Sequence, residues 1–93
     1  MVTANGNEKK SYSYPKAKAE LKKYKIPEGM KVDLWATEEC VEEPGRIGIC
    51  HKGPHSYLLY MTDKKGRVTY KQGYRQYRTA NYYAVQLVAK IAA

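Results

Sequence analysis

One turn constrains the fold of this chain more than any other feature of its sequence. Asp63–Gly66 separates two runs, Ser56–Thr62 and Arg67–Gln72, that are rich in strand-forming residues. Asp favours the first position of a type I turn, and Gly66 can supply the left-handed residue that closes a bulged hairpin. The sequence therefore predicts a β-hairpin, and with it an antiparallel sheet.

Two further strands are expected upstream of the hairpin. Residues Lys31–Thr37 alternate between apolar and polar positions, which places Trp35 on the polar face of that strand. A loop over Glu38–Gly45 leads to a second short strand over Arg46–Lys52. Each of these runs is short enough to belong to one small sheet.

A helix is expected on either side of the strands. Pro15 fits the first turn of a helix that runs to about Lys25. After a connector over Gly73–Arg78, Thr79 is a good helix cap, and apolar residues follow with helical spacing up to Ile91. The predicted fold class is therefore α+β: a three-stranded antiparallel β-meander covered by a C-terminal helix, with a short N-terminal helix. Residues 1–14 are expected to form a flexible tail and residues 15–93 a single domain.

Charge and aromatic content favour a polyanionic partner. The chain has 93 residues and a net charge of +8, and residues 44–93 hold nine Lys and Arg against a single acid, Asp63. Ten of its aromatic residues are Tyr, one is Trp and none is Phe. A basic, tyrosine-rich surface is typical of nucleic-acid binding, because guanidinium and ammonium groups meet phosphates while rings stack on bases. The alternative is that the charge serves solubility and that the tyrosines pack in strands.

The first strand and the last helix carry a family resemblance. Residues Val32–Cys40, followed by Val41–Gly45, resemble the opening of ribonuclease H, in which a first strand runs into an aspartate and then a loop that ends in Asn-Pro-Gly. Residues Thr79–Val85 resemble the Thr-x-Asn-Arg-x-Glu-Leu segment that opens the first long helix of that family. The resemblance implies that residues 31–93 form the first half of a ribonuclease H-like fold.

The same alignment implies that catalysis is absent. Ribonuclease H uses carboxylates to hold two divalent ions, but the first-strand aspartate aligns with Thr37 and the helix glutamate with Ala84. A shift of one residue brings Glu38 to the first position and leaves Ala84 unchanged. We therefore expect a non-catalytic protein with no cofactor.

Nucleic-acid contacts are expected around the connector. The resemblance implies that Asn81, and more weakly the backbone near Cys40, touch the nucleic-acid backbone. The residues themselves add Tyr74–Arg78, in which tyrosines alternate with arginines, and the basic outward face of the hairpin. The predicted contact residues are Arg67, Lys71, Tyr74, Arg75, Tyr77, Arg78 and Asn81, for RNA or DNA without distinction. The alternative is a solvated connector whose tyrosines fold back on the core.

Cysteine and histidine raise a second kind of site. All the cysteines and histidines lie within sixteen residues: Cys40, Cys50, His51 and His55. Two cysteines and two histidines are a common set of zinc ligands. The spacing lacks the close cysteine pair that preforms most zinc sites, and adjacent strand residues point to opposite faces. We expect no metal, a core Cys50, exposed histidines and reduced thiols. Residues 1–14 lack an apolar core and no run is long enough for a membrane span, so a cytoplasmic location without membrane contact is expected.

Two other functions remain open at this point. The sheet and helix also resemble the small N-terminal domain of tyrosine recombinases, which lays its sheet in the major groove; Arg67, Thr69 and Lys71 are then the reading face. A protein-interaction module is the alternative from a different class. In that case the first strand, Lys31–Thr37, is an open edge that recruits a partner or pairs two copies into a homodimer.

Overall fold

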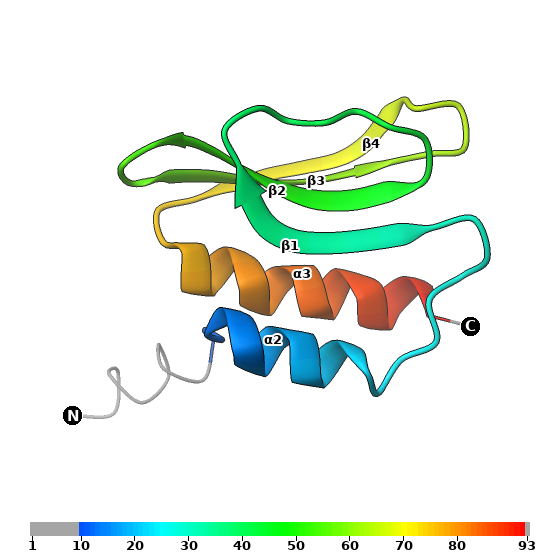
Figure 1. Ribbon diagram of the computed structural model, residues 1–93, viewed down its shortest axis with the longest axis horizontal. Coiled ribbons are helices and arrows are strands. Elements are labelled where there is room, and N and C mark those ends of the chain that lie inside the picture. The colour runs from blue at the N-terminus through cyan, green and yellow to red at the C-terminus, as the bar shows by residue number, and fades with distance from the viewer. Residues whose placement is uncertain (1–9, 93) are drawn as a thin grey trace.

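Two helices pack side by side on one face of a four-stranded sheet, as Figure 1 shows. The computed structural model describes residues 10–92. The N-terminal helix and the C-terminal helix contact each other, and the C-terminal helix also contacts all four strands. In chain order the elements are α2 (Tyr14–Leu21), β1 (Lys31–Thr37), β2 (Arg46–Gly53), β3 (Ser56–Thr62), β4 (Val68–Tyr74) and α3 (Tyr77–Ile91).

The predicted three-stranded antiparallel meander is wrong. The sheet has four strands in the order β1-β2-β3-β4, and β1 runs parallel to β2 while the other two pairs are antiparallel. Each of the four extended runs forms a strand, so the count of three in the predicted meander was too low. The fold class stays α+β with both expected helices, but the antiparallel first pair that the ribonuclease H resemblance implied does not form.

The parallel pair depends on a short crossover loop, residues 38–45. Parallel neighbours are usually joined by a dozen or more residues, often a helix. Here eight residues return the chain over the face of the sheet that the helices leave open (Figure 1). The loop is fastened there by Tyr60, whose hydroxyl accepts from Val41 N at 3.0 Å and donates to Val41 O at 2.9 Å. A disulfide between Cys40 and Cys50 ties the same loop to β2.

The apolar core lies between the sheet and α3. Alternation along each strand turns one set of side chains toward the helices, including Ile47 and Ile49 of β2 and Leu59 of β3. Ala84 and Val88 of α3 pack against them, and all five are almost fully buried. The outer face has its own buried group, since the Tyr60 ring lies over Gly48, where a Cβ atom would come within 2.6 Å of the tyrosine oxygen.

Both helix boundaries differ from the prediction. Helix α2 begins at Tyr14 with Ser13 as its N-cap, whose side chain accepts from Lys16 N, and it ends at Leu21 rather than near residue 25. Helix α3 begins at Tyr77 with Gln76 as its N-cap, so Thr79 lies inside the first turn. The connector therefore shrinks to two residues between β4 and α3.

The hairpin prediction is confirmed. Asp63 Oδ1 accepts from Lys65 N and Arg67 N, and Gly66 has φ +82°, the left-handed conformation that the turn requires. The register of β3 and β4 then shifts, because Thr62 faces Val68 while Met61 faces Tyr70. This bulge turns Val68 toward the same face as Lys71, which a simple alternation does not predict.

Residues 12–14, which were predicted to belong to the flexible tail, contact the helices. Most of the predicted flexible tail, residues 1–9, lies outside the described residues. Of the remainder, Tyr12 N donates to Arg78 O at 3.0 Å, Ser13 caps α2 and Tyr14 begins it. The domain therefore includes residues 12–14.

Candidate nucleic-acid interface

One end of the molecule collects the start of both helices; we call it the helix-start end. Strands β1, β2 and β4 end there and β3 begins there (left in Figure 1). The β2–β3 turn and the β4–α3 connector therefore lie at this end together with the start of α2. The opposite end holds the β3–β4 turn and the end of the crossover loop at Gly45; we call it the turn end.

Exposed cations surround the beginning of α3 at the helix-start end. Arg75 and Gln76 line two adjoining hollows of about 420 and 560 Å³. The first hollow also has Lys10 in its wall and the second has His55. Arg78 follows in the first turn of α3 and is exposed. Gln76 makes no side-chain cap hydrogen bond and the first turn holds no acidic residue, so no side chain offsets the positive end of the helix dipole there.

These cations are not neutralised within the described chain. Among residues 10–92, only Lys23 and Arg46 form ion pairs: Lys23 with Glu20, and Arg46 with Asp33 and Glu43. All three pairs lie away from Arg75 and Arg78. Within the described part of the chain, no ion pair therefore engages Arg75 or Arg78.

The two predicted tyrosines of the connector turn toward the fold. Tyr77 is half-buried and its hydroxyl donates to Leu34 O, which ties the start of α3 to β1. Burial raises the pKa of Tyr77 to about 12. Tyr74 stacks on Tyr83 at 5.1 Å between ring centroids, and burial raises its pKa well above the usual range. Both rings therefore pack on the protein beneath the exposed arginines rather than pointing into solvent.

Asn81 lies inside the protein. It is fully buried, and its Nδ2 donates to Tyr12 O at 3.3 Å. This bond and the one from Tyr12 N to Arg78 O hold residues 11–13 against α3. The contact that the ribonuclease H resemblance implied for Asn81 is replaced by this internal role.

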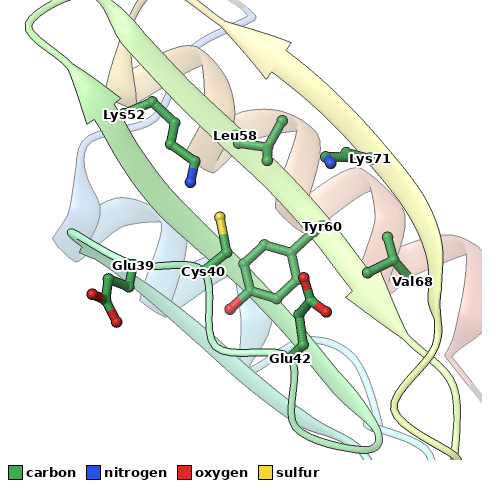
Figure 2. A pocket seen from close by; sticks show the side chains of 8 residues that line it. All are labelled: Glu39, Cys40, Glu42, Lys52, Leu58, Tyr60, Val68 and Lys71. Carbon is green, nitrogen blue, oxygen red and sulfur yellow. The ribbon is translucent and has the colours of Figure 1, made fainter.

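Arg67 and Lys71 lie apart from the connector. Arg67 precedes β4 at the turn end, and eight residues of extended chain separate it from Arg75 by roughly 26 Å. Lys71 lies on the outer face, in a hollow of about 280 Å³ (Figure 2). Figure 2 shows Lys52 and Lys71 on the strands and Glu39 and Glu42 on the crossover loop around this hollow, with Leu58, Tyr60 and Val68 also in its lining. The predicted site thus divides into three places, of which the helix-start end holds Arg75 and Arg78.

Trp35 is the residue that sequence reasoning passed over. It is 61% exposed, the most exposed large apolar side chain in the described part of the chain. Together with Ala36, His51, Tyr57 and Tyr77 it lines a small pocket of about 110 Å³ at the helix-start end. Its position on the polar face of β1 was predicted; a single tryptophan at such a position was the available signal.

Both cysteines form a disulfide, so the expectation of reduced thiols is wrong. The crossover loop brings Cys40 over β2, where its Cα lies 5.0 Å from that of Cys50. Cys50 is buried as expected, but His51 is half-buried and stacks on Tyr57 at 4.6 Å, whereas His55 is exposed. No group of three or more metal-ligating side chains occurs among residues 10–92.

Comparisons with protein-family models, curated proteins and solved structures found no match for this chain. The resemblances to ribonuclease H and to recombinase domains therefore receive no support from them. Within residues 10–92, no helix has the length and apolar character needed to cross a membrane.

Proposed function

We propose that this protein is a non-catalytic nucleic-acid-binding domain that contacts the phosphate backbone through its helix-start end. The observation that carries the proposal is the group of unpaired cations around the uncapped beginning of α3, with Arg75 shared by two adjoining hollows. Backbone N–H groups at a helix start and guanidinium groups both favour phosphate oxygens.

The distribution of acidic residues supports the same surface. Glu39 and Glu42 lie on the crossover loop and line the outer-face hollow opposite Lys52 and Lys71 (Figure 2). A polyanion along that hollow meets two carboxylates as well as two ammonium groups. At the beginning of α3 no acidic residue occupies the first turn. The net field therefore favours a backbone that passes across the helix-start end rather than along the outer face.

The alternative, a protein-interaction module acting through an open sheet edge, has weaker support. Strand β1 is an edge strand as expected, but its ladder with β2 is irregular between Asp33 and Thr37. The other edge, β4, carries Lys71 and follows Arg67. Irregular or charged edges discourage pairing with a second strand, including one from another copy.

The cytoplasmic location stays a prediction, and the disulfide weakens its basis. That location was inferred together with reduced thiols, whereas disulfides persist chiefly in oxidising compartments. Trapping free thiols with an alkylating agent in the producing cells tests it: two alkylated cysteines support the cytoplasm, and none supports an oxidising compartment.

The test of the proposed function is a binding titration with single-stranded, duplex and hybrid oligonucleotides at low and at physiological salt. A peptide nucleic acid strand of the same bases, which lacks phosphates, is the matched control. We expect measurable binding to the phosphate-bearing probes that weakens steeply with salt, and no binding to the control. Equal affinity for the uncharged strand, or no binding to any probe at low salt, contradicts the proposal.

A further inference from the structure

A pocket walled largely by rings opens beside the cations of the helix-start end. Trp35 and Ala36 from β1, His51 from β2 and Tyr57 from β3 form its wall with Tyr77 from α3. At about 110 Å³ it admits one flat ring rather than a folded segment of protein. Residues from four elements therefore converge on a space of defined shape.

The pocket wall is held in place by ring packing. His51 and Tyr57 lie face to face at 4.6 Å with an angle of 7° between their planes, and Tyr57 contacts Tyr77 at 5.6 Å. The Tyr77 hydroxyl donates to Leu34 O, which fixes this ring against β1. Such a wall is preorganised, because its rings lose little freedom when a ligand enters.

Trp35 lies within an irregular part of β1. Four residue steps of β1, from Asp33 to Thr37, face only two steps of β2, from Gly48 to Cys50. Asp33 Oδ1 accepts from Trp35 N within this bulge. Extra residues in one strand redirect side chains. The indole is left 61% exposed and touches Tyr14 edge-on, with ring centroids 5.4 Å apart.

Charge around the pocket selects the chemical class of the ligand. Lys18 Nζ lies 5.3 Å from the centre of the Tyr14 ring, which itself contacts Trp35. Arg75 and Arg78 flank the start of α3, where Tyr77 enters the pocket wall. Asp33, whose charge also acts on Tyr77, is paired with Arg46, so the cations near the pocket without an ion pair among residues 10–92 include Lys18, Arg75 and Arg78, and they attract a ring attached to an anionic backbone.

We propose that this pocket takes one unstacked nucleobase of a single-stranded nucleic acid, which stacks on Trp35 while Arg75 and Arg78 hold the neighbouring phosphates. The inference rests on the proposed function and deepens it, since it selects single strands over duplexes. A base paired within a duplex cannot enter a pocket of this size without leaving its stack.

The protein's single tryptophan makes the proposal directly measurable. Titration with a short oligothymidine should quench the intrinsic tryptophan fluorescence of the intact protein, because the base stacks on the only indole. An abasic oligomer of the same length, which keeps the phosphates, should bind more weakly and leave the fluorescence unchanged. Comparison of the two oligomers thus separates the contribution of the base from that of the phosphates.

Variants separate stacking from charge. Trp35→Ala should weaken oligothymidine binding by roughly 5- to 150-fold, the range for one lost stack, and leave abasic binding unchanged. Trp35→Phe should restore most of the affinity. Val68→Ala, at the other large exposed apolar side chain, is the matched control and should bind like the wild type. Thermal melts of each variant check that folding is retained.

The outcomes distinguish this inference from the proposed function. Oligothymidine binding without quenching, equal in wild type and Trp35→Ala, overturns the base pocket and leaves phosphate binding intact. Failure of every phosphate-bearing probe overturns both. A concentration-dependent dimer that Trp35→Ala abolishes, with no effect of oligothymidine on fluorescence, assigns the pocket to a second copy and also overturns the base pocket.

Discussion

Two regions at opposite ends of this molecule use polar groups in opposite ways. Around Gly45, at the turn end, backbone groups are paired inside the protein: Gly45 N donates to Asp63 O and Lys31 N to Gly45 O, whereas Lys64, Lys65 and Arg67 in the nearby turn are exposed. Arg46 there is 8% exposed and pairs with Asp33 and Glu43. At the helix-start end Arg75 and Arg78 are exposed and take no part in the ion pairs of residues 10–92.

This contrast indicates a division of labour between stability and binding. A substitution that breaks an internal hydrogen bond or ion pair lowers the stability of the protein, because it leaves a buried polar group unpaired. Exposed cations contribute little to stability but remain free to meet phosphates. Substitutions that disturb the paired groups around Gly45 should therefore change folding, substitutions of the exposed arginines at the helix-start end should change binding, and substitutions of the exposed lysines of the β3–β4 turn should change neither.

The largest expected effect on stability lies at Gly45. It has φ +65°, and a Cβ atom there would come within 2.2 Å of Gly29 O. Gly45→Ala should lower the free energy of unfolding by roughly 2–5 kcal/mol, the sum of backbone strain and overpacking. Urea unfolding measures the loss. Gly53→Ala is the control, since its nearest contact would be 4.0 Å away and its φ is not positive. Equal losses in both variants contradict a tightly closed turn end.

Reduction of the Cys40–Cys50 disulfide should have the next largest effect. The bond closes a loop with a sequence separation of 10 on the outer face, so its loss should lower the free energy of unfolding by about 2–3 kcal/mol. Urea unfolding with and without a phosphine reductant measures this. Oligonucleotide affinity should stay the same under native conditions, because the disulfide lies outside the proposed contact surface. A binding loss larger than the loss of folded protein would place the crossover loop in the interface.

How far the sequence predicts this fold depends on the range of the interaction concerned. Local signals found the hairpin at Asp63–Gly66 and all four extended runs, because turn chemistry and alternation act over a few residues. The parallel pairing of β1 with β2 was missed, since it depends on a loop fastened by Tyr60 and Cys50 from distant positions. A sequence shows the types of residue in that loop but not which strand it crosses.

The exposed charged residues of the candidate site could be predicted from the sequence more readily than the positions of its aromatic side chains. Long cationic side chains such as Arg75 and Arg78 stay in water wherever the backbone lies, so their exposure follows from residue type. Tyrosine packs or stacks according to its surroundings, and Tyr74 and Tyr77 both pack on the fold. The polar-face position of Trp35 follows from the alternation in β1, whereas its neighbours in the pocket come from β2, β3 and α3, which no local signal brings together.

A smaller effect is expected from alkaline pH at the helix-start end. Burial raises the pKa of Tyr77 from 10.0 to about 12, so the native state keeps a proton that the unfolded chain loses near pH 10. The free energy of unfolding should therefore be unaffected below pH 10 and should fall as the pH rises from 10 toward 12. Urea unfolding at pH 9 and pH 11 shows the fall. Tyr77→Phe should make this fall smaller but not abolish it, because the raised pKa of Tyr74 contributes to the same fall, and the variant also loses the hydrogen bond to Leu34 O. An unchanged pH dependence in the variant contradicts the burial of this hydroxyl.

The most direct test of the division between the two ends compares two double variants of equal charge. Arg75→Ala with Arg78→Ala removes two charges at the helix-start end, and Lys64→Ala with Lys65→Ala removes two in the turn between β3 and β4. Neither pair should change the free energy of unfolding by more than about 1 kcal/mol, because all four side chains are exposed.

The measurement is the salt dependence of oligothymidine affinity for these two variants and the wild type. We expect the arginine pair to weaken binding and to reduce the slope of log affinity against log salt by roughly 1–2 units, and the lysine pair to leave both near the wild-type values. Equal reductions in the two variants would show that charge acts without regard to position. That result would contradict a nucleic-acid interface at the helix-start end.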